Sequence, residues 1–176
     1  KLARKASCSV LALTHLNESK LNKILFGFDF SEYSLDALDV VLAFANAAGI
    51  KKVMAVYVYD VPIGYYKTGK TYEQFSDIVL TNAEKQYQQI IDNLDLKGIE
   101  LEPIFVQHEK PSIAINELAE KEKVDLVVLG ARGRNAVSSI LLGSVTVQLL
   151  QSIDKPILAV KKKQAGLSVL EALLKL

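Results

Sequence analysis

The sequence predicts a doubly wound α/β fold, an open sandwich in which a five-stranded parallel sheet carries helices on both faces. The chain has 176 residues, half of them hydrophobic, which is enough for one domain with its own core. Several short runs are almost purely apolar, as in parallel strands that are buried on both faces. Helical patterns alternate with these runs, and such alternation implies right-handed crossovers between parallel strands.

Five runs are expected to form the strands, because they combine β-branched, aromatic and leucine residues without alternation. They span residues 23–28, 53–59, 104–106, 125–129 and 156–160. In this Rossmann-like arrangement, ligands bind beyond the carboxyl ends of the strands, where the winding of the chain reverses. A functional site is therefore expected in the loops at residues 29–31, 60–71, 107–110 and 130–144.

Four stretches between the strands place apolar residues at helical spacing. They cover residues 35–45, 75–94, 111–119 and 145–153. Ser31 is placed to cap the first helix, Gly98 to close the second, and Pro111 to occupy the first turn of the third. Pro156 is expected to stop the fourth.

The α/β unit is expected to span residues 21–162, and a segment at each end falls outside it. Residues 6–13 resemble residues 154–160, the last strand segment, because apolar residues follow small or charged ones in both. Residues 1–20 are therefore interpreted as an N-terminal extension that could hold the last strand of an upstream sister domain. Residues 163–176 carry leucines at helical spacing and predict a C-terminal amphipathic helix.

The composition argues against several classes of protein. Lysine and arginine number 21 and aspartate and glutamate 20, so neither nucleic acid nor an anionic membrane is expected as a partner. Cys8 is the single cysteine, which excludes an intramolecular disulfide and a thiolate metal cluster. His15 and His108 stand far apart without a partner at ligand spacing, so no metal site is expected. No apolar run approaches the roughly 20 residues of a membrane-spanning helix, and a cytoplasmic protein is expected.

Residues 64–71, GYYKTGKT, match the phosphate-binding P-loop pattern in full. Three features count against a functional P-loop. The segment follows the second strand rather than the first, residues 60–63 delay its turn, and no later strand ends in the aspartate that would hold magnesium. The match is therefore interpreted as accidental, although Lys67 or Lys70 could still reach over a nearby phosphate site.

A second glycine loop, residues 130–144, competes for the same task, and a flexible surface loop with ordinary helix caps is the alternative interpretation. Gly130 and Gly133 allow the backbone to pass close to a ligand. Gly143 and Ser144 present main-chain N–H groups at a helix N-terminus, together with one hydroxyl, which suits an anion. Two arginines of the same loop add positive charge, Arg132 and Arg134.

The glycines and the serine of this second loop, at this spacing, resemble the ATP-binding signature of the universal stress protein family. Residues 23–32, KILFGFDFSE, resemble that family's first strand and its Asp-x-Ser turn. The similarity extends over about residues 22–161, with the elements in matching order. The resemblance implies a fold with five parallel strands and a homodimer through the last strand, from Pro156 to Val160.

The resemblance also implies where an adenosine would lie. Asp29, at the tip of the first strand, matches the family's aspartate beside the adenosine. Val58 falls where the family's second strand touches the adenine through its backbone, and Gly130 and Gly133 match the glycines next to the ribose and inner phosphates. One position departs from the family, because Lys110 stands where a glycine often precedes the proline of the third helix.

For the outer phosphates, the resemblance implies a cradle at the start of the fourth helix. Gly143, Ser144 and Val145 match the main-chain groups and the hydroxyl that hold these phosphates, and Arg132 adds mobile positive charge. The cofactor would be ATP, with Mg2+ held mainly by the phosphates. The lack of an aspartate after a later strand is then no obstacle.

The function implied is that of an ATP-binding universal stress protein domain, a nucleotide-dependent signalling and stress-response module that acts as a dimer. Two alternatives stay open. One is a dimerisation or interaction module without nucleotide, as part of a tandem protein or a transporter tail, and the other is a slow ATP-hydrolysing enzyme. His108 is the only nearby candidate for a general base and has no partner to position it, so a binding role is favoured over a dedicated ATPase.

Overall fold

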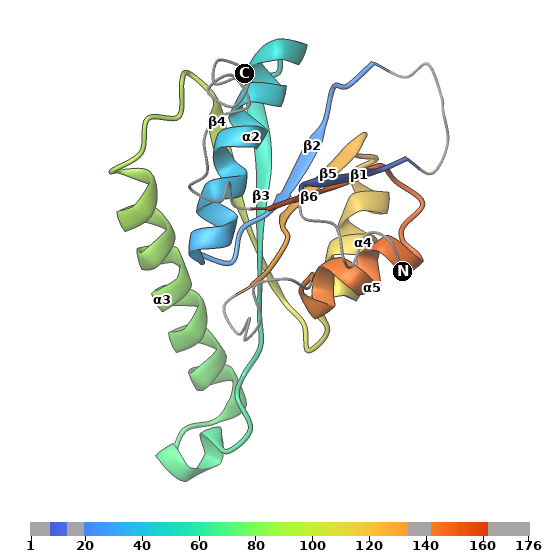
Figure 1. Cartoon of the computed structure of the whole chain (residues 1–176). Coiled ribbons are helices and arrows are strands. Elements are labelled where there is room, and N and C mark those ends of the chain that lie inside the picture. The colour runs from blue at the N-terminus through green and yellow to red at the C-terminus, as the bar shows by residue number, and fades with distance from the viewer. Residues whose placement is uncertain (1–7, 14–19, 134–141, 162–176) are drawn as a thin grey trace, which may run out of the picture.

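A six-stranded sheet forms the centre of the molecule. The computed structural model describes residues 8–13, 20–133 and 142–161 of the chain. The strands lie in the order β1-β6-β5-β2-β3-β4 (Figure 1). Their bounds are Val10–Ala12 for β1, Ile24–Gly27 for β2, Lys52–Tyr59 for β3, Glu100–Gln107 for β4, Leu126–Gly130 for β5 and Ile157–Val160 for β6. The amphipathic helix expected over residues 163–176 lies outside the described residues.

The five strands from β2 to β6 run parallel, as predicted. From β2, the next two strands, β3 and β4, lie toward one edge of the sheet, whereas β5 and β6 lie on the other side of β2. The winding therefore reverses between β2 and β5. The carboxyl ends of these two strands lie side by side, with Gly27 opposite Leu129. In open α/β sheets, this reversal point is where ligands bind.

The sixth strand, β1, was not part of the predicted sheet. It runs antiparallel to β6, with Val10 opposite Ala159, and the main-chain N–H of Lys161 donates to the Ser9 hydroxyl at 3.1 Å. The pattern in residues 6–13 indicated a strand, but strand propensity does not reveal a pairing partner. Because β1 pairs with the outer side of β6, it occupies the edge through which the homodimer was expected.

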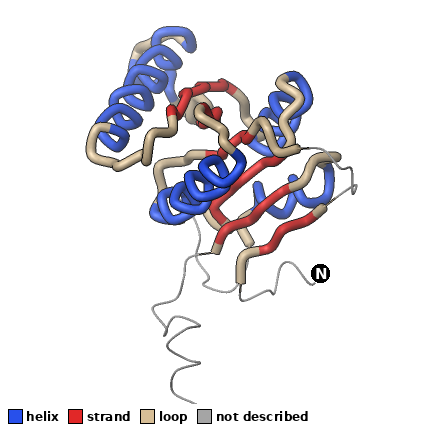
Figure 2. The backbone as a smooth tube through the Cα atoms, turned by 90° about the horizontal axis from the view of Figure 1, so that it is seen from above, coloured by secondary structure: helices blue, strands red, loops and turns tan. Residues whose placement is uncertain are grey.

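Helices cover both faces of the sheet, as predicted (Figures 1 and 2). One face carries α2 and α3, Glu32–Ala48 and Tyr72–Ile91, and the other carries α4 and α5, Pro111–Lys121 and Ser144–Ser152. Successive residues of β2 point to opposite faces, so Phe26 packs in the core beneath α2 and Leu25 in the core beneath α4 and α5. Within the described ranges, no helix is long and apolar enough to span a membrane.

Two of the four residues predicted to mark helix ends are confirmed, whereas α5 ends at Ser152, before the predicted stop at Pro156. Ser31 caps α2, its hydroxyl accepting from the N–H three residues on at 3.3 Å, and Pro111 occupies the first turn of α4. The prediction that Gly98 closes α3 was wrong, because α3 ends at Ile91 and Gly98 (φ 77°) lies just before β4. Leu96, between them, also packs against the core. The apolar pattern therefore continues past the helix, and spacing alone did not mark its end.

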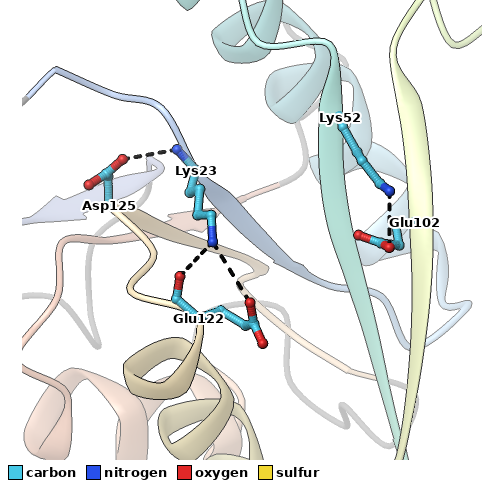
Figure 3. A network of polar contacts seen from close by, with 5 residues as sticks. All are labelled: Lys23, Lys52, Glu102, Glu122 and Asp125. Atoms are coloured by element: carbon cyan, nitrogen blue, oxygen red, sulfur yellow. Dashed lines mark hydrogen bonds and ion pairs between the residues drawn. The ribbon is translucent and has the colours of Figure 1, made fainter.

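Polar contacts at the amino ends of β2 and β5 hold these two strands together (Figure 3). The Asp125 carboxylate accepts from the main-chain N–H groups of Asn22 and Lys23, at 2.8 and 2.9 Å. The Lys23 ammonium donates to the Glu122 carbonyl at 2.9 Å and lies 3.8 Å from its carboxylate. Exposed ion pairs contribute little by themselves, so the two main-chain bonds of Asp125 are the stronger constraint. These bonds hold β2 and β5 together at their amino ends, and the reversal point lies at the carboxyl ends of the same two strands.

Candidate functional site

A cavity of about 330 Å3 opens beyond the carboxyl ends of β2 and β5. Its volume lies in the range of small-molecule sites. Every described residue predicted for a ligand site lines it, namely Asp29, Val58, Gly130, Arg132, Gly133, Gly143, Ser144 and Val145. These residues come from segments far apart in the sequence, and the parallel topology brings them to one edge of the sheet. Arg134, which was also singled out from the sequence, lies outside the described residues.

The turn that follows β2 is braced by Asp29. One carboxylate oxygen accepts from the main-chain N–H of Ser31 at 3.1 Å and from its hydroxyl at 2.5 Å, and Ser31 in turn caps α2. Phe30 adopts a left-handed backbone (φ 64°), which a bulky residue rarely does, and its ring stacks on that of Tyr57 at 4.4 Å between centroids. The aspartate therefore holds the start of α2, a role that the sequence did not reveal.

The glycines of the second loop make room for the protein itself. A Cβ at Gly130 would lie 2.8 Å from the main-chain carbonyl of Tyr33, in the first turn of α2. A Cβ at Gly133 would lie 2.9 Å from the Oδ2 atom of the Asp29 carboxylate. The sequence interpretation was that these glycines leave space for a ligand. In the structure, α2 occupies the space next to Gly130, and the Asp29 side chain occupies the space next to Gly133. The two glycines therefore allow these parts of the cavity wall to pack closely.

The N-terminus of α5 forms the anion-binding part of the lining. Gly143 is the N-cap residue. The expectation that it offers its own N–H to an anion was wrong, because this N–H donates to the Ala131 carbonyl at 2.7 Å. The N–H groups of a first helical turn have no acceptor within the helix, and those of Ser144, Val145 and Thr146 belong to residues that line the cavity. The buried Thr146 hydroxyl donates to the Gly130 carbonyl at 3.2 Å, which ties α5 to the end of β5. This helix end is therefore set to bind negative charge.

Another part of the lining is apolar. It consists of Val56 and Val58 of β3, Pro111 and Ile115 of α4, and Leu129 of β5. Of these residues, sequence reasoning found only Val58, and it found that one through the family resemblance. A flat ring with few charges suits such a surface. The cavity as a whole therefore fits a molecule that joins an apolar ring to a negatively charged tail.

Among the described residues that line the cavity, Arg132 is the one with a positively charged side chain. Its Nη1 donates to the Tyr33 hydroxyl at 3.2 Å, and its guanidinium carbon lies 5.2 Å from the centre of the Tyr33 ring. Sequence reasoning did not single out Tyr33. Nothing in the pattern of the first helix marks this tyrosine, because its partner is 99 residues away.

The site holds few groups that could carry out acid–base chemistry. His108 is not among the residues that line the cavity, and its Nδ1 accepts from the main-chain N–H of Lys110 at 2.8 Å. Asp29 is the one carboxylate in the described lining, and it already braces the turn after β2. Across the described residues, no group of three or more potential ligand side chains could hold a metal ion. The arrangement is suited to binding.

The P-loop-like segment has a different place in the structure. Gly64 and Gly69 flank the short 3-10 helix η1, Tyr65–Thr68, and both adopt left-handed backbone conformations. Thr71 is the N-cap of α3 and forms a capping box with Gln74. The described lining of the cavity contains no residue of this segment. The glycines and the threonine of the pattern are thus accounted for as helix caps.

Comparisons with known proteins identify the family. The model of the universal stress protein family matches residues 20–161. The universal stress protein MJ0577 of Methanocaldococcus jannaschii is 31% identical over 161 residues, which cover 81% of this chain and 96% of that protein. This chain belongs to the universal stress protein family. The solved structure of MJ0577 has the same fold, with a TM-score of 0.71 and 29% identity, over 84% of this chain and 100% of that chain.

Two further solved universal stress proteins share the fold. One, in complex with cAMP, superposes with a TM-score of 0.53 at 24% identity, over 81% of this chain and 98% of that chain. The other, from Archaeoglobus fulgidus, has a TM-score of 0.58 at 18% identity, over 90% of this chain and 51% of that chain. The family and the α/β fold expected from the sequence are confirmed.

Proposed function

We propose that this universal stress protein domain binds ATP and acts as a nucleotide-dependent module in a stress response. The observation that carries the proposal is the cavity at the reversal point, which joins an apolar surface to the N-terminus of α5 and the side chain of Arg132. ATP has the matching parts, a flat base and a strongly negative tail. Membership of the family supports the stress-response role.

In this proposal, the adenine contacts the main chain of Val58, and Asp29 lies beside the ribose. The phosphates are held by main-chain N–H groups at the start of α5 and by the Ser144 hydroxyl. Mg2+ is held mainly by the phosphates, since Asp29 is the one carboxylate in the described lining of the cavity. With no positioned base among these residues, binding is favoured over hydrolysis.

A cyclic adenine nucleotide is the alternative ligand. One universal stress protein of this fold has been crystallised in complex with cAMP. The single negative charge of a cyclic phosphate makes less use of a helix N-terminus and an arginine than a triphosphate does. ATP is therefore expected to bind more tightly than cAMP at this cavity.

Two measurements test the proposal. Mass spectrometry of the natively purified protein should detect a co-purified adenine nucleotide, and calorimetric titration should compare Mg-ATP, AMP and cAMP. With ATP at about 100 times its Kd, the free energy of unfolding should rise by about 2.7 kcal/mol. The proposal fails if no nucleotide co-purifies and if added Mg-ATP leaves the unfolding transition unchanged.

A pair of serine variants on α5 sharpens this test. Ser144→Ala removes a hydroxyl from the cavity end of the helix and should lower ATP affinity about tenfold, because a hydroxyl bond to a charged phosphate is lost. Ser152→Ala removes the matching hydroxyl at the other end of α5, where it donates to the Gln148 carbonyl. This control should leave ATP affinity unchanged. Equal effects of the two variants would argue against phosphate binding at the start of α5.

The proposal includes a homodimer through the strand from Pro156 to Val160, and the structure adds a condition to it. β1 already pairs with that edge, so a second copy reaches the main chain of β6 only after β1 has left. β1 has three residues, and Leu11 on it is 48% exposed, so its hold on the edge is expected to be weak. The antiparallel pairing of β1 with β6 also fits the proposal that residues 1–20 carry the last strand of an upstream sister domain.

Light scattering with size-exclusion chromatography tests the role of β1. A variant that lacks residues 1–13 should form more dimer than the intact chain at the same concentration, because it exposes the edge of β6. If both stay monomeric over the same range, the homodimer through β6 is rejected. The amphipathic helix over residues 163–176 and the cytoplasmic location remain predictions.

A further inference from the structure

We infer that Tyr33 is a positioning residue, which holds the Arg132 guanidinium in place for a phosphoryl group of the ligand. Through this contact, Tyr33 sets the affinity of the cavity for the phosphate tail and leaves the affinity for the nucleoside unchanged. The inference rests on the proposed function, because it concerns the phosphate end of the same cavity.

The backbone explains why Tyr33 stands beside Arg132. The first turn of α2 is fixed by the Asp29–Ser31 hydrogen bonds and lies against the end of β5. Gly130 permits this approach, since a Cβ there would lie only 2.8 Å from the main-chain carbonyl of Tyr33. Arg132 follows Gly130 by two residues, so the packing of α2 on β5 brings the tyrosine ring to the arginine side chain.

Two contacts hold the guanidinium. The hydrogen bond from Nη1 to the Tyr33 hydroxyl, at 3.2 Å, limits where the group can lie, and the ring beneath it, at 5.2 Å, adds a cation–π attraction. A free arginine side chain has many rotamers, and ordering it on binding costs conformational entropy. Both partners are half-buried. Tyr33 therefore bears part of the ordering cost before the ligand arrives.

Arg132 keeps its place at the cavity while it is bonded to Tyr33. It lines the cavity, and a Cβ at Gly143 would lie 3.4 Å from the Arg132 Cα atom, so this residue adjoins the start of α5. The positive charge of Arg132 and the positive end of the α5 dipole therefore lie in neighbouring segments of the cavity wall. Because Arg132 is the one cation in the described lining, losing its orientation should affect charged ligands selectively.

The test is a double-mutant cycle on the full chain, with three probes titrated by calorimetry: ATP, adenosine and inorganic triphosphate. Arg132→Gln should weaken ATP and triphosphate about tenfold, because a charge-assisted bond is lost. Tyr33→Phe keeps the ring and removes only the hydroxyl, and it should weaken both about fivefold while the adenosine affinity stays the same. In the Arg132→Gln background, Tyr33→Phe should have no further effect, because the hydroxyl acts through the guanidinium.

The control variant is Tyr66→Phe, which removes a hydroxyl from a tyrosine that is 64% exposed on η1 and lies outside the described lining. It should bind all three probes like the unmodified chain. The inference is overturned if Tyr33→Phe leaves the affinities for ATP and triphosphate unchanged, if adenosine weakens equally, or if the two substitutions are additive.

Failure of the proposed function gives a different pattern. If the unmodified chain does not bind ATP but does bind triphosphate, the ATP proposal is lost, and the triphosphate titrations decide the role of Tyr33. If neither probe binds, both proposals are wrong. If ATP binds and Tyr33→Phe has no effect, only the inference about Tyr33 is overturned.

Discussion

The two glycine loops of this protein, residues 64–71 and 130–144, use similar residue types in different surroundings. In the first, Gly64 and Gly69 adopt left-handed backbone conformations at the ends of η1, and nothing lies within 4 Å of where a Cβ would stand. In the second, Gly130 lies against the backbone of α2 and also lines the cavity. The first glycines serve a local turn, and the second serves a contact between elements.

The position of each loop in the sheet explains the difference. The first loop follows β3 and extends beyond the sheet, at the bottom of the view in Figure 1. The second loop begins at the end of β5, beside β2, where the winding reverses. Only there do a strand end, the start of α2 and the start of α5 meet. We therefore expect a glycine-rich motif to mark a phosphate site only where the topology supplies neighbouring main-chain N–H groups.

The largest expected effect comes from Gly130→Val. The new side chain would collide with the main chain of Tyr33, which cannot move without shifting α2. We expect a loss of about 3 kcal/mol in the free energy of unfolding, measured by urea denaturation, and loss of nucleotide binding. If the variant is as stable as the unmodified chain and still binds ATP, α2 can move away from β5 without a loss in the free energy of unfolding, and the prediction is wrong.

Gly133→Ala should have a smaller effect on stability and a clear one on binding. Its Cβ would meet the Asp29 carboxylate at 2.9 Å, and a side chain can rotate where a backbone cannot. The free energy of unfolding should fall by about 1 kcal/mol, and ATP affinity should fall about tenfold because Asp29 is displaced. Thermal unfolding and calorimetric titration measure the two quantities. Unchanged binding would remove Asp29 from the proposed site.

Gly69→Ala gives the matched result for the other loop. The residue has φ 72°, where an alanine is strained, but the space around it is open. The free energy of unfolding should fall by about 1 kcal/mol, and ATP affinity should stay unchanged. Weaker binding would connect the first loop to the proposed nucleotide site.

The smallest effect is expected from Lys70→Ala. In a functional P-loop, the lysine contacts the phosphates, and its loss abolishes binding. Here Lys70 is exposed, just before the N-cap of α3, and is not part of the described lining of the cavity. ATP affinity should therefore change less than about twofold, well under the effect of one charged contact. Loss of binding would reverse the comparison and make residues 64–71 the phosphate loop.

Much of this architecture could be read from the sequence. Buried parallel strands are continuously apolar, so runs such as Ile24–Gly27 and Leu126–Gly130 stand out. Ser31 and Pro111 mark helix starts through local chemistry. The order of strands and helices then places the loops of Asp29 and Gly130 at one edge of the sheet. Local signals of this kind need no knowledge of distant contacts.

The tertiary structure alone decided which distant residues meet. The place of β1 on β6 depends on an edge that becomes available only when the sheet is assembled. The pairing of Tyr33 with Arg132, and the reason why Gly130 must lack a side chain, depend on how closely α2 packs on β5. Composition and periodicity are properties of neighbouring residues. Contacts across about a hundred residues are set by packing, and packing exists only in the folded chain.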